Sequence, residues 1–125
     1  MLKLNAASLV SEEGRAGWAA AGVALPAFDH AAMCAATKAH PIWVHFGAGN
    51  IFRGFIAKLQ QELLNQGLAQ KGIVAADTFD YDIIDKIYLP FDNLTLNVTL
   101  NANATTSREI IGSVAEALRA DSSDA

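Results

Sequence analysis

The chain contains very little cysteine, proline or histidine, and it has no long apolar run. Its single cysteine, Cys34, excludes an internal disulfide framework. No stretch approaches the roughly 18 apolar residues of a membrane span, and the start does not resemble a secretory signal. We therefore expect a cytoplasmic protein. No pair of histidines and carboxylates has metal-ligand spacing, so we expect no metal site.

Positive charge is also scarce. Nine lysines and arginines stand against thirteen aspartates and glutamates, a formal net charge of −4, and the basic residues form no patch. This balance argues against a nucleic-acid surface. The length of 125 residues, with 52% hydrophobic and 18% charged residues, is typical of one globular domain.

Residues 1–41 predict a helical lead-in. Ser11 is a helix N-cap candidate, followed by acidic residues in the first turn. A second short helix is expected to begin at Asp29 and to end before Pro41. We assign residues 1–41 to a helical extension and residues 42–125 to the N-terminal part of a dinucleotide-binding domain.

A glycine-rich turn follows a short apolar run, and an amphipathic helix follows the turn. Residues 44–46 have the length of one short strand. Gly47 permits a tight turn, and Gly49 lets phosphate groups approach the backbone. The first amides of the helix, on Asn50 and Ile51, are then available to an anion. This order of elements predicts a phosphate-binding turn; the alternative is a plain turn between a strand and a helix.

Phe52 occupies the place of a third glycine, so either the helix lies slightly farther from the sheet or the Phe52 ring finds a pocket of its own. We expect Asn50 to cap the helix and Gly67 or Gly72 to end it. Arg53, in the first turn, opposes the helix dipole, which suggests a bound anion; the alternative is a solvated arginine. One helix face is expected to pack on a sheet (Ile51, Phe52, Phe55, Ile56, Leu59, Leu63, Leu64), and the opposite one to be solvated (Lys58, Gln60, Gln61, Glu62).

The next apolar run, residues 73–77, predicts a second strand that ends in a carboxylate. Asp77 lies 28 residues after Gly49. An acidic side chain there can accept hydrogen bonds from an adenosine ribose and would repel a 2′-phosphate, which favours NAD over NADP. The alternative is a strand-end cap. Asp80 and Asp82 are rival candidates, although they more plausibly open a short helical turn.

The remaining sequence predicts further strands. Residues 94–100 alternate apolar and polar side chains, as half-buried strands do, and residues 101–107 form a loop. Residues 108–119 are ambiguous, and we favour a strand with a helical end. The expected fold is α/β, a partial Rossmann-type doubly wound sheet after a helical lead-in.

The turn and its surroundings resemble the mannitol dehydrogenase family, the polyol-specific long-chain dehydrogenases. Gly47, Gly49 and Arg53 match the Gly-x-Gly-x-Phe-x-Arg pattern of that family, while Ile51 replaces the phenylalanine. Ala76-Asp77 matches the acidic end of the second strand. The resemblance covers roughly residues 15–120 and extends to the mannitol-1-phosphate and fructuronate or tagaturonate enzymes.

The resemblance implies NAD-dependent, zinc-independent hydride transfer between a polyol or sugar acid and its keto form. It implies that Gly47, Gly49, Asn50 and Ile51 hold the pyrophosphate, that Asp77 holds the ribose and that Arg53 assists. The catalytic lysine, asparagine and histidine of the family lie in a helical C-terminal domain that has no counterpart here. We therefore expect an N-terminal fragment without catalytic residues. The alternatives are a non-catalytic nucleotide-binding or interaction module, and a fragment that self-associates through its incomplete sheet.

Overall fold

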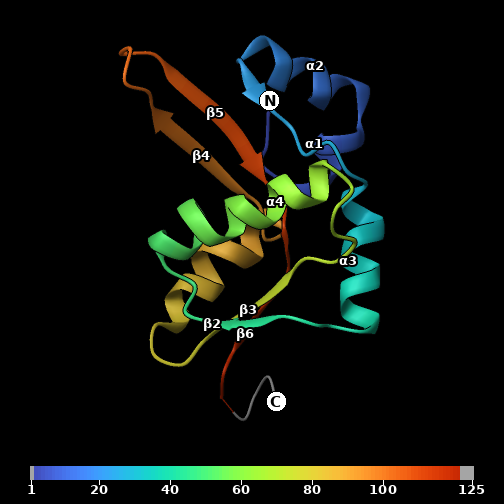
Figure 1. Cartoon of the computed structure of the whole chain (residues 1–125), viewed down its shortest axis with the longest axis vertical. Coiled ribbons are helices and arrows are strands. Elements are labelled where there is room, and N and C mark those ends of the chain that lie inside the picture. The colour runs from blue at the N-terminus through green and yellow to red at the C-terminus, as the bar shows by residue number, and fades with distance from the viewer. Residues whose placement is uncertain (1, 122–125) are drawn as a thin grey trace.

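The structure is a computed structural model that describes residues 2–121, and it contains two three-stranded sheets (Figure 1). Residue 1 and residues 122–125, the end of the predicted 42–125 unit, lie outside the described residues. In the described part no helix is long and apolar enough to cross a bilayer.

The first sheet is parallel and has the order β2-β3-β6. Its strands are β2 (Val44–Phe46), β3 (Ile73–Asp77) and β6 (Val114–Arg119). The strands predicted at residues 44–46 and 73–77 are thus confirmed. Every residue of β3 is buried, as expected for the central strand of a parallel sheet.

Helices lie on both faces of this sheet. On one face, η1 (Phe52–Ile56), α4 (Ala57–Asn65) and η2 (Ile83–Tyr88) share a core with β3 and β6. Opposite, α3 (His30–Ala39) packs on β6 through Met33. The adjacent β6 residues Val114 and Ala115 enter these two different cores. Because side chains alternate along a strand, this division confirms the α/β, doubly wound arrangement.

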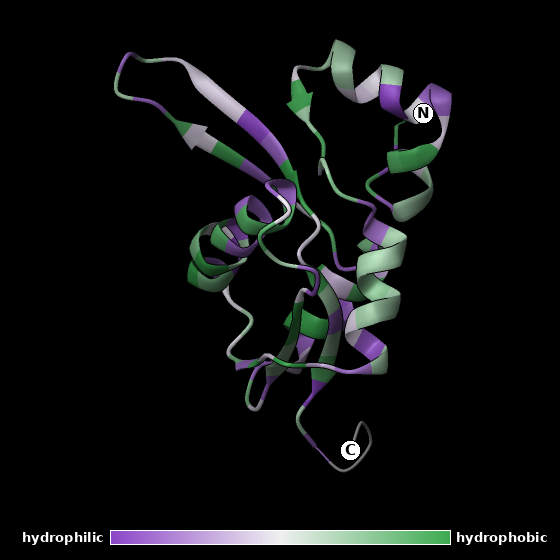
Figure 2. Cartoon of the chain, turned by 45° about the vertical axis from the view of Figure 1, so that its right-hand side comes forward, coloured by the Kyte–Doolittle hydropathy of each residue, from purple (hydrophilic) through white to green (hydrophobic). Residues whose placement is uncertain are grey.

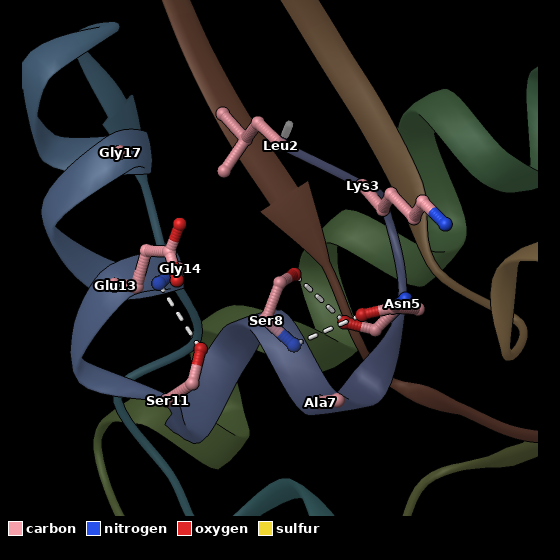
Figure 3. A pocket seen from close by; sticks show the side chains of 9 residues that line it. All are labelled: Leu2, Lys3, Asn5, Ala7, Ser8, Ser11, Glu13, Gly14 and Gly17. Carbon is pink, nitrogen blue, oxygen red and sulfur yellow. Dashed lines mark hydrogen bonds between the residues drawn. The ribbon is translucent and has the colours of Figure 1, made fainter.

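The N-terminal segment is mostly helical, as predicted, and it also contributes one short strand. Helices α1 (Ala6–Val10) and α2 (Glu12–Ala20) precede a two-residue strand, β1 (Val23–Ala24). Ser11 caps α2 by accepting a hydrogen bond from the Gly14 N–H at 3.0 Å (Figure 3). β1 pairs in parallel with β5 (Thr106–Ile111), so the lead-in and the C-terminal half share a sheet. The domain boundary at residue 41 stays a prediction.

The strand expected at residues 94–100 is β4 (Thr95–Leu100), which follows the short η3 helix (Leu89–Phe91). It forms an antiparallel hairpin with β5, and this hairpin reaches away from the parallel sheet (Figure 1). The helical end predicted within residues 108–119 is wrong, because this stretch forms the end of β5 and the whole of β6. Its apolar spacing suits two strands on either side of Gly112 and Ser113 as well as it suits a helix.

The prediction for the faces of the helix after the turn is confirmed for buried Phe52 and Leu64, but it is wrong at most of its other positions. The apolar stripe of Ile51, Phe55, Leu59 and Leu63 is exposed, whereas Gln60 and Gln61 are buried. Gln61 faces the β5–β6 connection: its amide nitrogen donates to the Ile110 carbonyl at 2.6 Å, and its amide oxygen accepts from the Gly112 N–H at 2.6 Å. Bonds to the polar backbone of this connection therefore bury Gln61, which helical periodicity placed on the solvated face.

We expect Gln61→Ala to lower the free energy of unfolding by about 2–4 kcal/mol, because it leaves a buried N–H and a buried C=O without partners. Urea denaturation followed by circular dichroism measures this loss. The matched control is Gln66→Ala, at the exposed end of α4, for which we expect a change below about 0.5 kcal/mol. Equal losses in the two variants would show that the Gln61 bonds do not fix the helix.

Candidate functional site

The glycine turn joins the end of β2 to the first turn of the helix. Gly47 has φ +111°, a conformation that side-chain-bearing residues rarely adopt. Its N–H donates to the Ala76 carbonyl at 2.7 Å, which is the last bond between β2 and β3. At Gly49, a Cβ atom would meet no atom of the protein within 4 Å. Space is therefore open over Gly49, where a ligand can approach the backbone.

The helix begins at Asn50, so Asn50 is not the N-cap that the sequence suggested. The Arg53 N–H donates to the Gly49 carbonyl at 3.0 Å and closes the first helical turn. Within residues 2–121, no hydrogen bond engages the N–H groups of Gly49, Asn50 or Ile51. Such groups at a helix start are donors for an anion.

Arg53 turns its guanidinium back onto the turn. One nitrogen donates to the Ala48 carbonyl at 2.8 Å, and another donates to the Asn50 side-chain oxygen. The guanidinium also lies over the Tyr88 ring, 5.8 Å from its centroid. The Arg53 side chain is therefore half-buried and bonded to the turn, and its positive charge lies beside the free amides.

Asp77 closes β3 next to the glycine turn. Its carboxylate accepts the N–H groups of Phe79 at 2.9 Å, of Asp80 at 2.8 Å and of Ala48 at 3.3 Å. Burial alone would raise the pKa of Asp77, but these three backbone donors together hold the pKa below its usual value. Asp77 is thus an ionised, nearly buried carboxylate that links β3 to the turn, as the strand-end alternative required. Asp80 contributes a backbone N–H to it and is exposed.

Phe52 finds the pocket that the sequence required. Its side chain is 2% exposed, and its ring stacks on His45 with centroids 4.5 Å apart. His45 is fixed in turn, since its Nδ1 is 2.9 Å from the Gly47 carbonyl oxygen. A groove of about 540 Å³ lies over this pair and the helix start. Its wall consists of His45, Gly47, Gly49, Asn50, Ile51, Phe52 and Ile56.

Tyr88 belongs to the site and was missed from the sequence. It is fully buried, and its hydroxyl donates to the Ala48 carbonyl at 3.0 Å from 40 residues further along the chain. Burial raises the pKa of Tyr88 to about 12, although the nearby Arg53 opposes that rise. No local motif marks this tyrosine, because its role depends on how η2 packs.

A second hollow, of about 450 Å³, lies beside α1 and α2 (Figure 3). Its polar side chains serve the helices: Ser11 caps α2, and the Asn5 side chain accepts the Ser8 N–H at 2.9 Å. In the described chain, no group of three or more histidine, cysteine, aspartate or glutamate side chains is placed to hold a metal ion. The glycine turn is therefore the better candidate for a ligand site.

We expect the acid sensitivity of the fold to depend on Asp77. Its folded-state pKa lies below the usual 3.8, so its stabilising contribution is present above that pH and is lost as the pH falls through the folded-state value. Denaturant unfolding from about pH 7 to about pH 2 should show this loss in the wild type and a flatter profile in Asp77→Asn. Asp80→Asn, which leaves Asp77 in place, is the control. A wild-type profile in Asp77→Asn would contradict the role given to Asp77.

Known proteins with the same sequence pattern and fold are sugar-alcohol and sugar-acid enzymes. No protein-family model matches the chain. The chain is 48% identical over 109 residues to D-mannonate oxidoreductase of Thermotoga maritima. These residues make up 87% of this chain and 20% of that protein.

Solved structures give the same fold. Pseudomonas fluorescens mannitol 2-dehydrogenase, in a ternary complex with NAD and D-mannitol, has a TM-score of 0.71 at 23% identity, over 94% of this chain and 22% of its own. A substrate-free D-sorbitol dehydrogenase has a TM-score of 0.69 at 20% identity, over 96% of this chain and 22% of its own. The chain spans about a fifth of the length of these proteins. The chain is thus similar in sequence to one fifth of D-mannonate oxidoreductase, and it shares its fold with the matching segments of a mannitol and a sorbitol dehydrogenase.

Proposed function

We propose that this chain is the NAD-binding part of an oxidoreductase that interconverts a polyol or sugar acid, of the mannitol or mannonate type, and its keto form. The observation that carries the proposal is the open space over Gly49, beside unpaired helix amides and the Asp77 carboxylate. The names of the similar proteins support the same reaction class. The expected cytoplasmic location stays a prediction.

The residues of the turn fit a dinucleotide. The amides of Gly49, Asn50 and Ile51 would bind the pyrophosphate, with Gly47 setting the path of the backbone. Arg53 would add its positive charge there while its hydrogen bonds hold the turn. Asp77 accepts three backbone N–H groups, and an ionised carboxylate has about four lone-pair sites. It therefore retains capacity for a ribose hydroxyl.

NAD, when bound, supplies the hydride chemistry. This chain's part is to bind and orient it. The negative charge of Asp77 would repel a 2′-phosphate, so NAD should bind more tightly than NADP. The groove formed with His45 and Phe52 offers an apolar wall beside the turn. We assign no catalytic residue to this chain; proton transfer to the substrate would fall to groups outside it.

We expect Gly49→Val to abolish NAD binding with little change in thermal stability, because the added side chain fills ligand space and meets no protein atom at its Cβ. Calorimetric titration of the 125-residue chain with NAD and NADP measures the first effect, and thermal melting measures the second. The matched control is Gly54→Ala, where a Cβ also meets nothing within 4 Å but lies past the turn. NAD binding that persists in Gly49→Val would refute the site.

A second candidate function, association through the sheet edge, is favoured by the state of β2. β2 is an edge strand, and the side chains of Val44 and Phe46 are 49% and 67% exposed. Trp43 and Gly47 make the backbone bonds to β3, so by alternation the backbone groups of Val44 and Phe46 point to the open side. Such an edge is a template for another strand.

If this edge pairs with a second copy, the wild type should sediment as a concentration-dependent dimer. Phe46→Lys should shift it to monomer, because a charged side chain on an edge opposes pairing. Leu100→Lys is the matched control: Leu100 is 83% exposed but lies on the hairpin, away from β2. A wild type that remains monomeric at high concentration would remove this candidate without touching the NAD proposal.

A further inference from the structure

The peptide groups around Ala48 are engaged by side chains from three separate elements. Ala48 is fully buried. Its carbonyl accepts from the Tyr88 hydroxyl at 3.0 Å and from the Arg53 guanidinium at 2.8 Å, while its N–H reaches the Asp77 carboxylate at 3.3 Å. Loops near ligands usually expose their backbone to water. In this turn, the backbone of the middle residue is instead fixed from within the protein.

Arg53 spans the two residues on either side of Gly49. It donates to the Ala48 carbonyl and to the Asn50 side-chain oxygen. The Tyr88 ring packs against the Arg53 guanidinium, and the Tyr88 hydroxyl donates to the Ala48 carbonyl. Because its pKa is raised to about 12, that hydroxyl stays protonated and remains a donor near neutral pH.

The geometry of a trans peptide gives this arrangement a consequence for the ligand. All described peptide bonds are trans, and in a planar trans peptide the C=O and the following N–H point in opposite directions. The Ala48 carbonyl points toward buried Tyr88. The N–H of Gly49, in the same peptide plane, therefore points away from Tyr88, and within residues 2–121 no hydrogen bond engages it.

We propose that Tyr88, together with Arg53, is a positioning residue that orients the Gly49 N–H toward the phosphates of the bound nucleotide. The inference rests on the proposed function and adds to it a residue with no sequence motif. Fixing a donor before the ligand arrives removes part of the ordering cost of binding. Arg53 then acts chiefly by holding the turn, and its charge is a secondary contribution.

The experiment compares Tyr88→Phe with Tyr81→Phe, the only two tyrosines of the chain. The Tyr81 hydroxyl is exposed, and it donates to the Thr78 carbonyl at 3.4 Å rather than to Ala48. The first readout needs no ligand: the NMR order parameter of the Gly49 N–H. We expect a rigid value of about 0.85 in the wild type and in Tyr81→Phe, and a clear fall in Tyr88→Phe.

The second readout is the dissociation constant for ADP compared with that for adenosine, which lacks phosphates. Tyr88→Phe should weaken ADP binding about five- to tenfold and leave adenosine binding unchanged, since one hydrogen bond that orients the turn is lost. Equal losses for ADP and adenosine would reduce Tyr88 to a structural role. A Gly49 order parameter equal to that of the wild type would overturn the proposal outright.

Arg53→Gln is a second variant, because this half-buried side chain can be replaced with less risk to the core than Tyr88. It should also lower the Gly49 order parameter; an unchanged value in this variant would contradict the proposal. A wild type that binds neither ADP nor NAD would defeat the proposed function. The order parameters would still decide whether Tyr88 and Arg53 orient the turn.

Discussion

One hydrogen bond determines where the rest of the site can be. The Gly47 N–H donates to the Ala76 carbonyl at 2.7 Å, so β2 and β3 end side by side. The next residue on each strand, Ala48 on one and Asp77 on the other, must then lie close enough to bond. Gly47 makes this bond while turning the chain through a positive φ, which allows the helix to start immediately. A shift of one residue in this register would separate the carboxylate from the turn.

The helix after the turn is held by directional polar bonds as well as by the buried side chains of Phe52, Ala57 and Leu64. Gln61 binds the β5–β6 connection, and the Ser113 hydroxyl donates to the Ala57 carbonyl at 2.6 Å. Lys58 reaches Glu109 of β5 at 3.1 Å. Four apolar side chains of this helix face outward instead of packing on the sheet: Ile51, Phe55, Leu59 and Leu63. The β4–β5 hairpin also exposes apolar side chains to solvent. Apolar and polar segments alternate along it (Figure 2).

The order of elements was predictable because it rests on local chemistry. Ser11 and Asp29 are caps whose side chains accept the N–H three residues later, as their type and position indicate. The strands at residues 44–46 and 73–77 were visible as apolar runs bounded by glycine and a carboxylate. Asp77 was found as a strand end, and the structure adds the three backbone donors that it accepts.

What could not be predicted depends on contacts between distant parts of the chain. Gln61 is buried because of bonds to residues about 50 positions away. Tyr88 reaches Ala48 across 40 positions. Periodicity describes which residues share a helix face, but it does not say which face meets the sheet when a polar backbone is the neighbour. The helical end predicted within residues 108–119 was wrong for a related reason. Two short strands on either side of Gly112 and Ser113 reproduce the apolar spacing of a helix.

The pairing pattern also has a consequence for how the chain is made. β1 pairs with β5 through Val23 and Arg108, and β3 pairs with β6 through Asp77 and Arg119. Each sheet thus includes one strand from residues 106–119. Synthesis delivers the N-terminal residues first, at about 5–20 residues per second. Neither pairing can therefore form until residues 106–119 have left the ribosome, and until then β1 and β3 lack these partner strands.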